Sequence, residues 1–314
     1  MKYEEIASLA SNLKQNIQKV LVGRDDQIEL ALTALLVGGH VLLEDVPGTG
    51  KTTLAKALAK SLDCSFSRVQ FTPDLLPADI TGMRVWHQQT GEFVFMQGPV
   101  FCNILVADEI NRATPRTQSA LLECMEEKQV SEGGKTYTLE APFFVIATQN
   151  PVETQGTFPL PEAQLDRFLV RLSMGYPSRQ ETITMLKRFN GKTPLTDLQP
   201  VASAKDLNEA HALYTECHIS DSILDYIAAL CETARNPEQV KLGPSPRAEL
   251  MLMRAAQALA AIRGRDYVIP DDVKALAVPV LAHRVLLRGM MKQNAAAYLT
   301  ELLQTVPSPT EEAL

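Results

Sequence analysis

Short apolar runs alternate with helix-like segments through the first 172 residues of this 314-residue chain. Each run is too short for a buried helix, whereas intervening segments such as residues 53–62 and 114–127 have helical spacing. Strands that alternate with helices pair in parallel, and helices cover both faces of the resulting sheet. The pattern predicts an α/β fold with a parallel five-stranded sheet between helices. The expected strands cover residues 40–43, 67–71, 104–107, 143–148 and 168–172.

The strand pattern ends near residue 177, and the rest of the chain is predicted to be helical. Helix starts are marked there by N-cap serines and first-turn prolines: Ser203, Ser220, Ser245, Pro246 and Pro270. The basic residues Arg284, Arg288 and Lys292 follow at four-residue spacing, which is typical of a solvated helix face. We therefore expect an α/β domain over residues 1–177 and a smaller all-α domain over residues 178–314.

Composition and charge argue against several classes of protein. The chain has 30 Lys and Arg against 37 Asp and Glu, and its net charge of -7 has the wrong sign for binding nucleic acid over the whole surface. The five cysteines are far apart without a Cys-x-x-Cys pair, so they indicate neither a disulfide framework nor a zinc site. No stretch approaches the ~18 apolar residues of a membrane span, and the N-terminus lacks signal-peptide features. We expect a cytoplasmic protein without a membrane span.

A glycine-containing loop follows the first apolar run and has the composition of a phosphate-binding loop. Its sequence is Asp45-Val46-Pro47-Gly48-Thr49-Gly50-Lys51-Thr52, and a predicted helix begins near Thr53. Backbone N–H groups of such a loop and the helix N-terminus form a concave anion site. Lys51 would reach the terminal phosphates of a nucleotide, and the Thr52 hydroxyl can bind Mg²⁺. The predicted cofactors are ATP and Mg²⁺, although Asp45 stands where the general pattern has glycine.

Two adjacent carboxylates follow the run at residues 104–107, at the carboxyl edge of the predicted sheet, where open α/β sheets bind ligands. We expect them to have different roles. Asp108 would hold Mg²⁺ together with Thr52. Glu109 would orient the water that attacks the γ-phosphate and remove its proton, which contributes about 10²–10⁴ in rate.

Three further residues complete the predicted active site. Asn150 follows the run at residues 143–148 and can position the attacking water or the γ-phosphate. Charge that develops on the γ-phosphate needs more positive partners than one lysine and one Mg²⁺. Arg167, just before the last apolar run, and Arg247, at the start of a predicted helix in the second domain, are the candidates.

These motifs together resemble the AAA+ ATPases and, more narrowly, the MoxR family, over nearly the whole chain. The segments that carry the resemblance are Val22-Gly23-Arg24, residues 42–52, Asp108-Glu109-Ile110-Asn111-Arg112-Ala113, Ala147-Thr148-Gln149-Asn150-Pro151, residues 160–168 and Ser245-Pro246-Arg247. Asp45 is the residue that this family tends to carry in its phosphate loop.

The resemblance implies roles that spacing alone does not show. Asn150 corresponds to sensor 1, Arg247 to sensor 2, and Arg167 to the arginine finger that enters the site of a neighbouring subunit. The family forms rings, usually hexamers, and an arginine finger contributes about 10³–10⁵ in rate. Val22 and Gly23 would lie beside the adenine. The predicted nucleotide-binding residues are then Val22, Gly23, Val46, Pro47, Gly48, Thr49, Gly50, Lys51, Thr52 and Thr53.

Two predicted hairpins interrupt the α/β pattern. The first pairs residues 84–87 with residues 92–95, and the second pairs residues 129–131 with residues 135–138 around a Gly-Gly turn. By resemblance, they correspond to the helix-2 insert and to the hairpin before sensor 1, which face the pore or the client protein. They can equally be surface hairpins with structural aromatics.

The leading functional hypothesis is an oligomeric, Mg²⁺-dependent ATPase that remodels or matures partner proteins. By resemblance, its partner is a separate client or a protein with a von Willebrand A domain. An AAA+ nucleic-acid motor or loader, a metal-chelatase motor subunit and a nucleotide-gated scaffold with little turnover are the alternatives.

Overall fold

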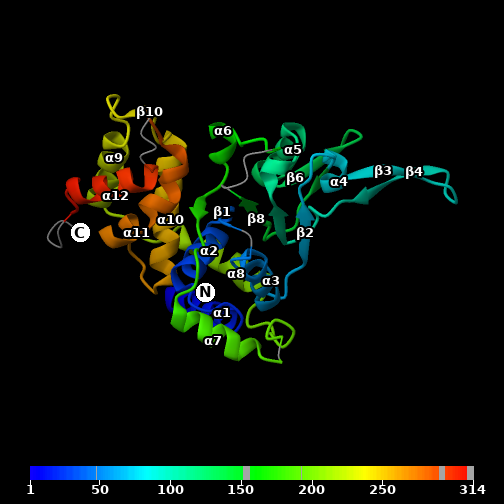
Figure 1. Cartoon of the computed structure of the whole chain (residues 1–314), viewed down its shortest axis with the longest axis horizontal. Helices are drawn as coiled ribbons and strands as arrows, with labels where there is room; N and C mark the ends of the chain where they lie inside the picture. Colours follow the sequence, from blue (N-terminus) through cyan, green and yellow to red (C-terminus); the bar gives the residue numbers. More distant parts are fainter. Residues whose placement is uncertain (47, 151–155, 192, 290–293, 310–314) are drawn as a thin grey trace.

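The computed structural model describes residues 1–46, 48–150, 156–191, 193–289 and 294–309. Within these residues, the central sheet has five strands in the order β2-β5-β8-β1-β9 (Figure 1). All neighbouring strands in it are parallel. The predicted α/β fold is therefore confirmed. The strands are β1 (Val41–Glu44), β2 (Phe66–Gln70), β5 (Ile104–Asp108), β8 (Phe144–Gln149) and β9 (Val170–Leu172).

Side chains of the central strands alternate between two hydrophobic clusters, one on each face of the sheet. In β5, Ile104 and Val106 belong to the larger cluster, whereas Leu105 and Ala107 belong to the smaller one. All five β5 residues are buried, as expected for a parallel strand with both faces covered. The helices of this part are α1 (Tyr3–Gln18), α2 (Asp25–Val37), α3 (Lys51–Ser61), α4 (Pro77–Thr81), η1 (Ile110–Arg112), α5 (Pro115–Glu127) and α6 (Glu162–Leu165).

The second part of the chain is helical, as predicted. Ser203, Ser220 and Ser245 each accept a hydrogen bond from a first-turn N–H group, which confirms them as N-caps. Two short strands, β10 (Val240–Leu242) and β11 (Leu286–Leu287), also pair there, and they are too short to give a sequence pattern. The helices are α7 (Arg179–Phe189), α8 (Ala204–Tyr214), α9 (Asp221–Thr233), α10 (Pro246–Ile262), α11 (Pro270–Leu281), η2 (Ala282–Arg284) and α12 (Ala295–Thr305).

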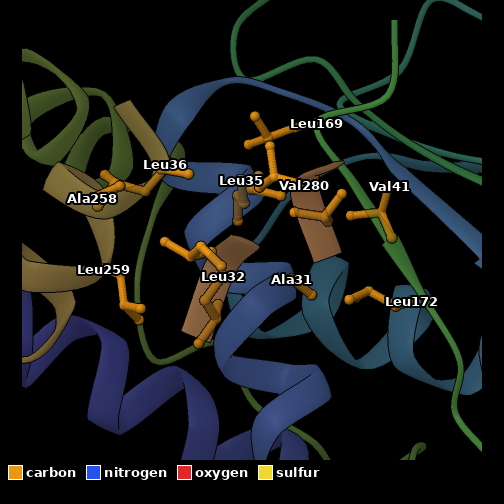
Figure 2. Close-up of a cluster of buried hydrophobic side chains, with 14 of the residues drawn as sticks. Ala31, Leu32, Leu35, Leu36, Val41, Leu169, Leu172, Ala258, Leu259 and Val280 are labelled. Atoms are coloured by element: carbon orange, nitrogen blue, oxygen red, sulfur yellow. The ribbon is translucent and has the colours of Figure 1, made fainter. Parts of the chain in front are cut away.

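The larger hydrophobic cluster joins the two parts. Figure 2 shows Leu32 and Leu35 of α2 between Leu259 of α10 on one side and Val280 of α11 and Val41 of β1 on the other. Helix α8 also packs against α1 and α2. We place the division between the parts at residue 177 as a proposal, because the sheet ends with β9 and the next element is α7.

Both predicted hairpins are present and extend from the α/β body (Figure 1). They are formed by β3 (Gly82–His87) with β4 (Glu92–Gln97) and by β6 (Gln129–Glu132) with β7 (Lys135–Thr138). Phe95 of the first stacks on Tyr137 of the second, with ring centroids 4.2 Å apart. Trp86 and Phe93 pair edge to face near the tip and are both more than half exposed. The first hairpin therefore presents aromatic side chains to its surroundings.

His40, just before β1, makes stability depend on pH. Its ring is buried, Nδ1 accepts a hydrogen bond from the Val145 N–H, and Nε2 lies 3.1 Å from the Met125 carbonyl oxygen. Burial lowers the pKa of His40 from 6.5 to about 4. Because the folded pKa lies below the unfolded one, the neutral ring stabilises the fold above pH 6.5, and this contribution is lost as the pH falls toward 4.

We therefore expect the loss of stability attributable to His40 to reach about 3 kcal/mol by pH 4. His40→Gln carries no titratable ring, so its urea-unfolding free energy should fall less than that of the wild type between pH 7 and pH 4.5. Equal slopes of stability against pH in the two proteins would show that His40 titrates normally in the fold.

Candidate functional site

The predicted phosphate loop connects β1 to α3, and its backbone adopts the conformation that glycine permits. Gly48 and Gly50 have φ values of 85° and 96°, in the left-handed region that side chains rarely adopt. Gly50 is the N-cap of α3, and it provides no side chain to accept hydrogen bonds from the first turn. The backbone N–H groups of this first turn, which includes Thr52 and Thr53, therefore suit an anionic ligand. Pro47 lies outside the described residues.

Asp45 has a structural role that explains why it replaces the usual glycine. Its side chain is buried, and Oδ1 accepts a hydrogen bond from the Val46 N–H at 2.9 Å. Oδ2 accepts a second one from the Gly175 N–H at 2.7 Å. Gly175 lies in the segment between β9 and α7, so Asp45 fixes the start of the phosphate loop to that segment. A glycine at this position would leave that N–H without its partner.

Lys51 begins α3 and is bonded to its own loop. Its Nζ donates to the Asp45 carbonyl oxygen at 2.9 Å. Burial lowers the pKa of Lys51, and the nearby carboxylates of Asp45, Asp108 and Glu109 act in the opposite direction. The ammonium group therefore lies within electrostatic reach of both carboxylates at the carboxyl end of β5.

Asp108 ends β5 with its side chain directed at polar neighbours. Oδ1 accepts a hydrogen bond from the Thr148 hydroxyl at 3.3 Å, and Oδ2 forms an ion pair with Arg68 Nε at 2.5 Å. The sequence had not pointed to Arg68, which lies on the adjacent strand β2. A carboxylate oxygen and the Thr52 hydroxyl are donors that suit Mg²⁺, which commonly takes one or two protein ligands beside substrate phosphates.

Glu109 has an unusual backbone and a fixed side chain. Its φ of 54° is left-handed, a conformation that costs energy for a residue other than glycine and is common at functional sites. The Glu109 N–H donates to the Thr148 hydroxyl at 2.9 Å. The carboxylate accepts from the Gln70 amide at 2.7 Å and pairs with Arg112 Nε at 3.1 Å. Both side-chain partners hold the carboxylate at the edge of the sheet.

Asn150 follows β8 directly, and it is buried. In the sheet, β8 lies between β5, which carries Asp108, and β1, which leads to the phosphate loop. The Asp45 N–H donates to the carbonyl of Gln149, the residue before Asn150, at 3.2 Å. The structure therefore brings the phosphate loop, both carboxylates and Asn150 to one edge of the sheet.

The two candidate arginines lie close together, but their ion pairs are not with the residues at the carboxyl edge of the sheet. Arg167 forms an ion pair with Glu126 near the end of α5, and Arg247 Nη1 contacts the same carboxylate at 3.0 Å. Arg247 Nε also lies 4.0 Å from Asp166. The arginine side chains are 30% and 47% exposed, so a second molecule could contact them. Sequence reasoning had not identified Glu126, because nothing along the chain links it to either arginine.

The predicted solvated helix face at residues 284–292 is wrong, because η2 ends at Arg284, β11 covers Leu286–Leu287, and the Arg284 side chain is buried. This residue ends η2, and its side chain is only 3% exposed. It donates to the Asp166 carboxylate at 2.6 Å and to the Phe168 carbonyl at 2.6 Å. Arg288 is exposed, whereas Lys292 lies outside the described residues. Four-residue spacing alone does not distinguish a solvated cation from one that a loop of another domain covers.

Arg284→Met should lower the free energy of unfolding by about 3 kcal/mol, because it removes the buried guanidinium that donates to the Asp166 carboxylate and to the Phe168 and Leu169 carbonyl oxygens. Arg254→Met is the matched control, and we expect a change of about 0.5 kcal/mol or less because its side chain is exposed. Urea unfolding of both variants tests this. A similar small loss in both would mean that the buried contacts of Arg284 contribute little.

The described part of the chain has neither a membrane-spanning helix nor a separate metal-binding cluster. No helix there is long and apolar enough to cross a membrane. Nor do three or more His, Cys, Asp or Glu side chains gather there in a way that could hold a metal ion. The fit to Mg²⁺ therefore depends on Thr52 and Asp108 together with a bound triphosphate.

Comparison with known proteins first defines the class. The family model described as ATPase family associated with various cellular activities (AAA) matches residues 40–170. A second model, described as AAA lid domain, matches residues 232–302. The matched regions contain the phosphate loop, both carboxylates and Asn150 in one case and Arg247 in the other.

Comparison with individual proteins defines the family. The chaperone MoxR1 of Mycobacterium tuberculosis is 42% identical over 95% of this chain and 82% of its own length. Protein MoxR of Methylorubrum extorquens is 32% identical over 96% of this chain and 95% of its own. A crystal structure of a Cytophaga hutchinsonii protein has a TM-score of 0.91 at 38% identity, covering 98% of this chain and 97% of that one. The chain belongs to the MoxR family of AAA+ ATPases.

A magnesium-chelatase subunit ChlI homolog of Methanocaldococcus jannaschii is a more distant relative. It is 29% identical over 58% of this chain and 50% of its own length.

Proposed function

We propose that this chain is an oligomeric, Mg²⁺-dependent ATPase that hydrolyses ATP to ADP and phosphate and uses the reaction to remodel or mature partner proteins. The observation that supports it most is the convergence of Lys51, Asp108, Glu109 and Asn150 at one sheet edge, beside a loop with two left-handed glycines. The family membership supports the same activity. The proposed compartment is the cytoplasm.

Each residue has a proposed task in the reaction. The loop N–H groups and Lys51 bind the phosphates, and Thr52 and Asp108 would hold Mg²⁺, which would supply further positive charge to the phosphates. Glu109 accepts a proton from the attacking water while the water oxygen bonds to the γ-phosphorus. The bond from that phosphorus to the bridging oxygen breaks, so ADP leaves with the electron pair. Asn150 positions the water or the γ-phosphate.

The position of the arginines supports the proposal of a ring. Arg167 and Arg247 bond to Glu126 on α5 rather than to the phosphate loop or the carboxylates at the carboxyl end of β5. Their partly exposed side chains are suited to meet the γ-phosphate of a neighbouring subunit. We infer that the site is completed between subunits, in a closed ring that is most simply a hexamer, as the family resemblance implies.

The alternative functions have less support. A net charge of -7 does not favour a nucleic-acid motor or loader. The similarity to the chelatase homolog covers only 58% of this chain. Turnover by the assembled protein would exclude a scaffold that binds ATP without hydrolysing it.

Remodelling of other proteins is tested by trapping the ATP state. Glu109→Gln should bind ATP without hydrolysing it and retain its partner proteins, whether separate clients or a protein with a von Willebrand A domain. Lys51→Ala, which lacks the phosphate-binding ammonium, is the control. Proteins retained only by Glu109→Gln with ATP, whose conformation then changes during wild-type turnover, support remodelling. The same set of proteins on both variants contradicts nucleotide-dependent binding.

A further inference from the structure

The segment that precedes α2 lies against the phosphate loop. The Leu21 side chain packs on Gly50, since a Cβ atom built on that glycine would meet Leu21 Cδ1 at 3.0 Å. Two residues later, Gly23 has a left-handed φ of 66°. A side chain at Gly23 would collide with the carboxylate of Glu181, in the first turn of α7. Residues 21–23 therefore connect the proposed phosphate site to the Glu181 carboxylate.

The Glu181 carboxylate is held in one orientation. Oε2 accepts a hydrogen bond from the Ser178 N–H at 2.6 Å, while the Ser178 hydroxyl accepts one from the Glu181 N–H at 3.3 Å. Arg24 Nη1 lies 3.9 Å from the same Oε2. These contacts form the capping box of α7 and occupy Oε2. Oε1 is the oxygen nearest to the position of a Gly23 side chain.

The carboxylate is also ionised and fixed relative to the phosphate loop. The Ser178 N–H lowers the pKa of Glu181, and Arg24 acts in the same direction. Arg24 donates to the Gly175 carbonyl at 3.0 Å, and Asp45 accepts from the Gly175 N–H at 2.7 Å. The segment between β9 and α7 thus bonds through Gly175 both to Asp45 of the phosphate loop and to Arg24 beside Glu181.

We propose that Glu181 determines which nucleotide base the site accepts, with Oε1 accepting a hydrogen bond from the 6-amino group of adenine. This inference depends on the proposed function, because it places the triphosphate in the loop beside Gly50. A base with a carbonyl at position 6 would place an oxygen against the carboxylate and leave both acceptors without a donor. Sites that bind a polar group in this way reject the mismatched analogue strongly.

A carboxylate with one oxygen left for the base suits adenine better than guanine. Guanine offers two adjacent donors, its N1–H and 2-amino group, and a carboxylate binds them in parallel with both of its oxygens. In Glu181, one oxygen is already bonded to Ser178 and faces Arg24. The remaining Oε1 matches the single amino group at position 6 of adenine.

The test compares ATP with inosine triphosphate, which has a carbonyl at position 6 and no 2-amino group. Equilibrium binding is measured in the Glu109→Gln background, so that hydrolysis does not contribute. We expect the protein to prefer ATP by about 10-fold to 100-fold. The further change Glu181→Gln keeps the capping box, because its amide oxygen can accept from Ser178, and it turns an NH₂ donor toward the base. The preference for ATP should then fall at least about 10-fold, with inosine triphosphate binding more tightly.

Asp206→Asn is the matched control, because Asp206 forms the equivalent capping box with Ser203 at the start of α8. It should leave the ratio of the two affinities unchanged. An unchanged ratio in Glu181→Gln, with both nucleotides still bound, would overturn the role of Glu181 while leaving the proposed ATPase intact. Failure of ATP to bind the protein that keeps Glu181 would overturn both proposals.

Discussion

Glu109→Gln is expected to lower ATP hydrolysis by about 10²–10⁴ while ATP binding stays within a few-fold of the wild type. The carboxylate is the group that would accept the proton of the attacking water, and an amide of the same shape cannot. Its Gln70 and Arg112 contacts hold it at the sheet edge, separate from the loop that binds the phosphates. Phosphate release measures turnover, and titration with ATP measures affinity.

The matched control is Glu127→Gln, because Glu127 ends α5 with an exposed side chain. We expect its turnover and affinity to equal those of the wild type. Turnover by Glu109→Gln close to the wild-type rate would show that another group accepts the proton. A loss of ATP binding in that variant would instead show that Glu109 supports the binding site.

Arg167→Ala should lower turnover of the assembled protein by about 10³–10⁵, with little change in assembly or ATP affinity. Within its own chain, Arg167 bonds to Glu126 and to the carbonyl of Leu122, both on α5. In the proposed ring, its guanidinium would act on the site of a neighbouring subunit. Phosphate release at a concentration where light scattering shows complete assembly measures the effect.

Arg254→Ala is the control for loss of an exposed arginine, and its turnover should match the wild type. The specific activity of the wild type should also fall on dilution, as rings dissociate. An Arg167→Ala protein that turns over normally in its assembled form would contradict the role of this arginine in a shared site.

Much of the fold could be predicted because burial leaves a direct mark on the sequence. The runs that became β5 and β8 were located to within one residue, since both faces of these strands are covered. The predicted last strand begins at residue 168, two residues before β9, and both end at Leu172. Phe168 is an apolar residue and is buried, yet its N–H donates to the Leu165 carbonyl in a turn and not to a neighbouring strand. An apolar run reports burial rather than the hydrogen bonds that define a strand.

The contiguous motifs of the candidate site could also be found, but their partners could not. Arg68 reaches Asp108 only because β2 pairs with β5. Glu126 meets Arg167 and Arg247 only because α5 and two later segments converge. Such contacts depend on the order of strands and the packing of helices, which local spacing does not encode. Glu181 belongs to the capping box of α7, and only its contact with Gly23, which the fold creates, relates it to the site.

A site shared by two chains is tested most directly by mixing two inactive variants. Glu109→Gln lacks the base but can donate Arg167, whereas Arg167→Ala keeps Glu109 and lacks the donated arginine. In rings assembled from equal amounts, about a quarter of the sites combine an intact Glu109 with a neighbour's Arg167. We expect the mixture to recover about a quarter of wild-type turnover, while each variant alone remains near background. Mixed rings, verified by mass, that show no recovery would contradict a site completed by a neighbouring subunit.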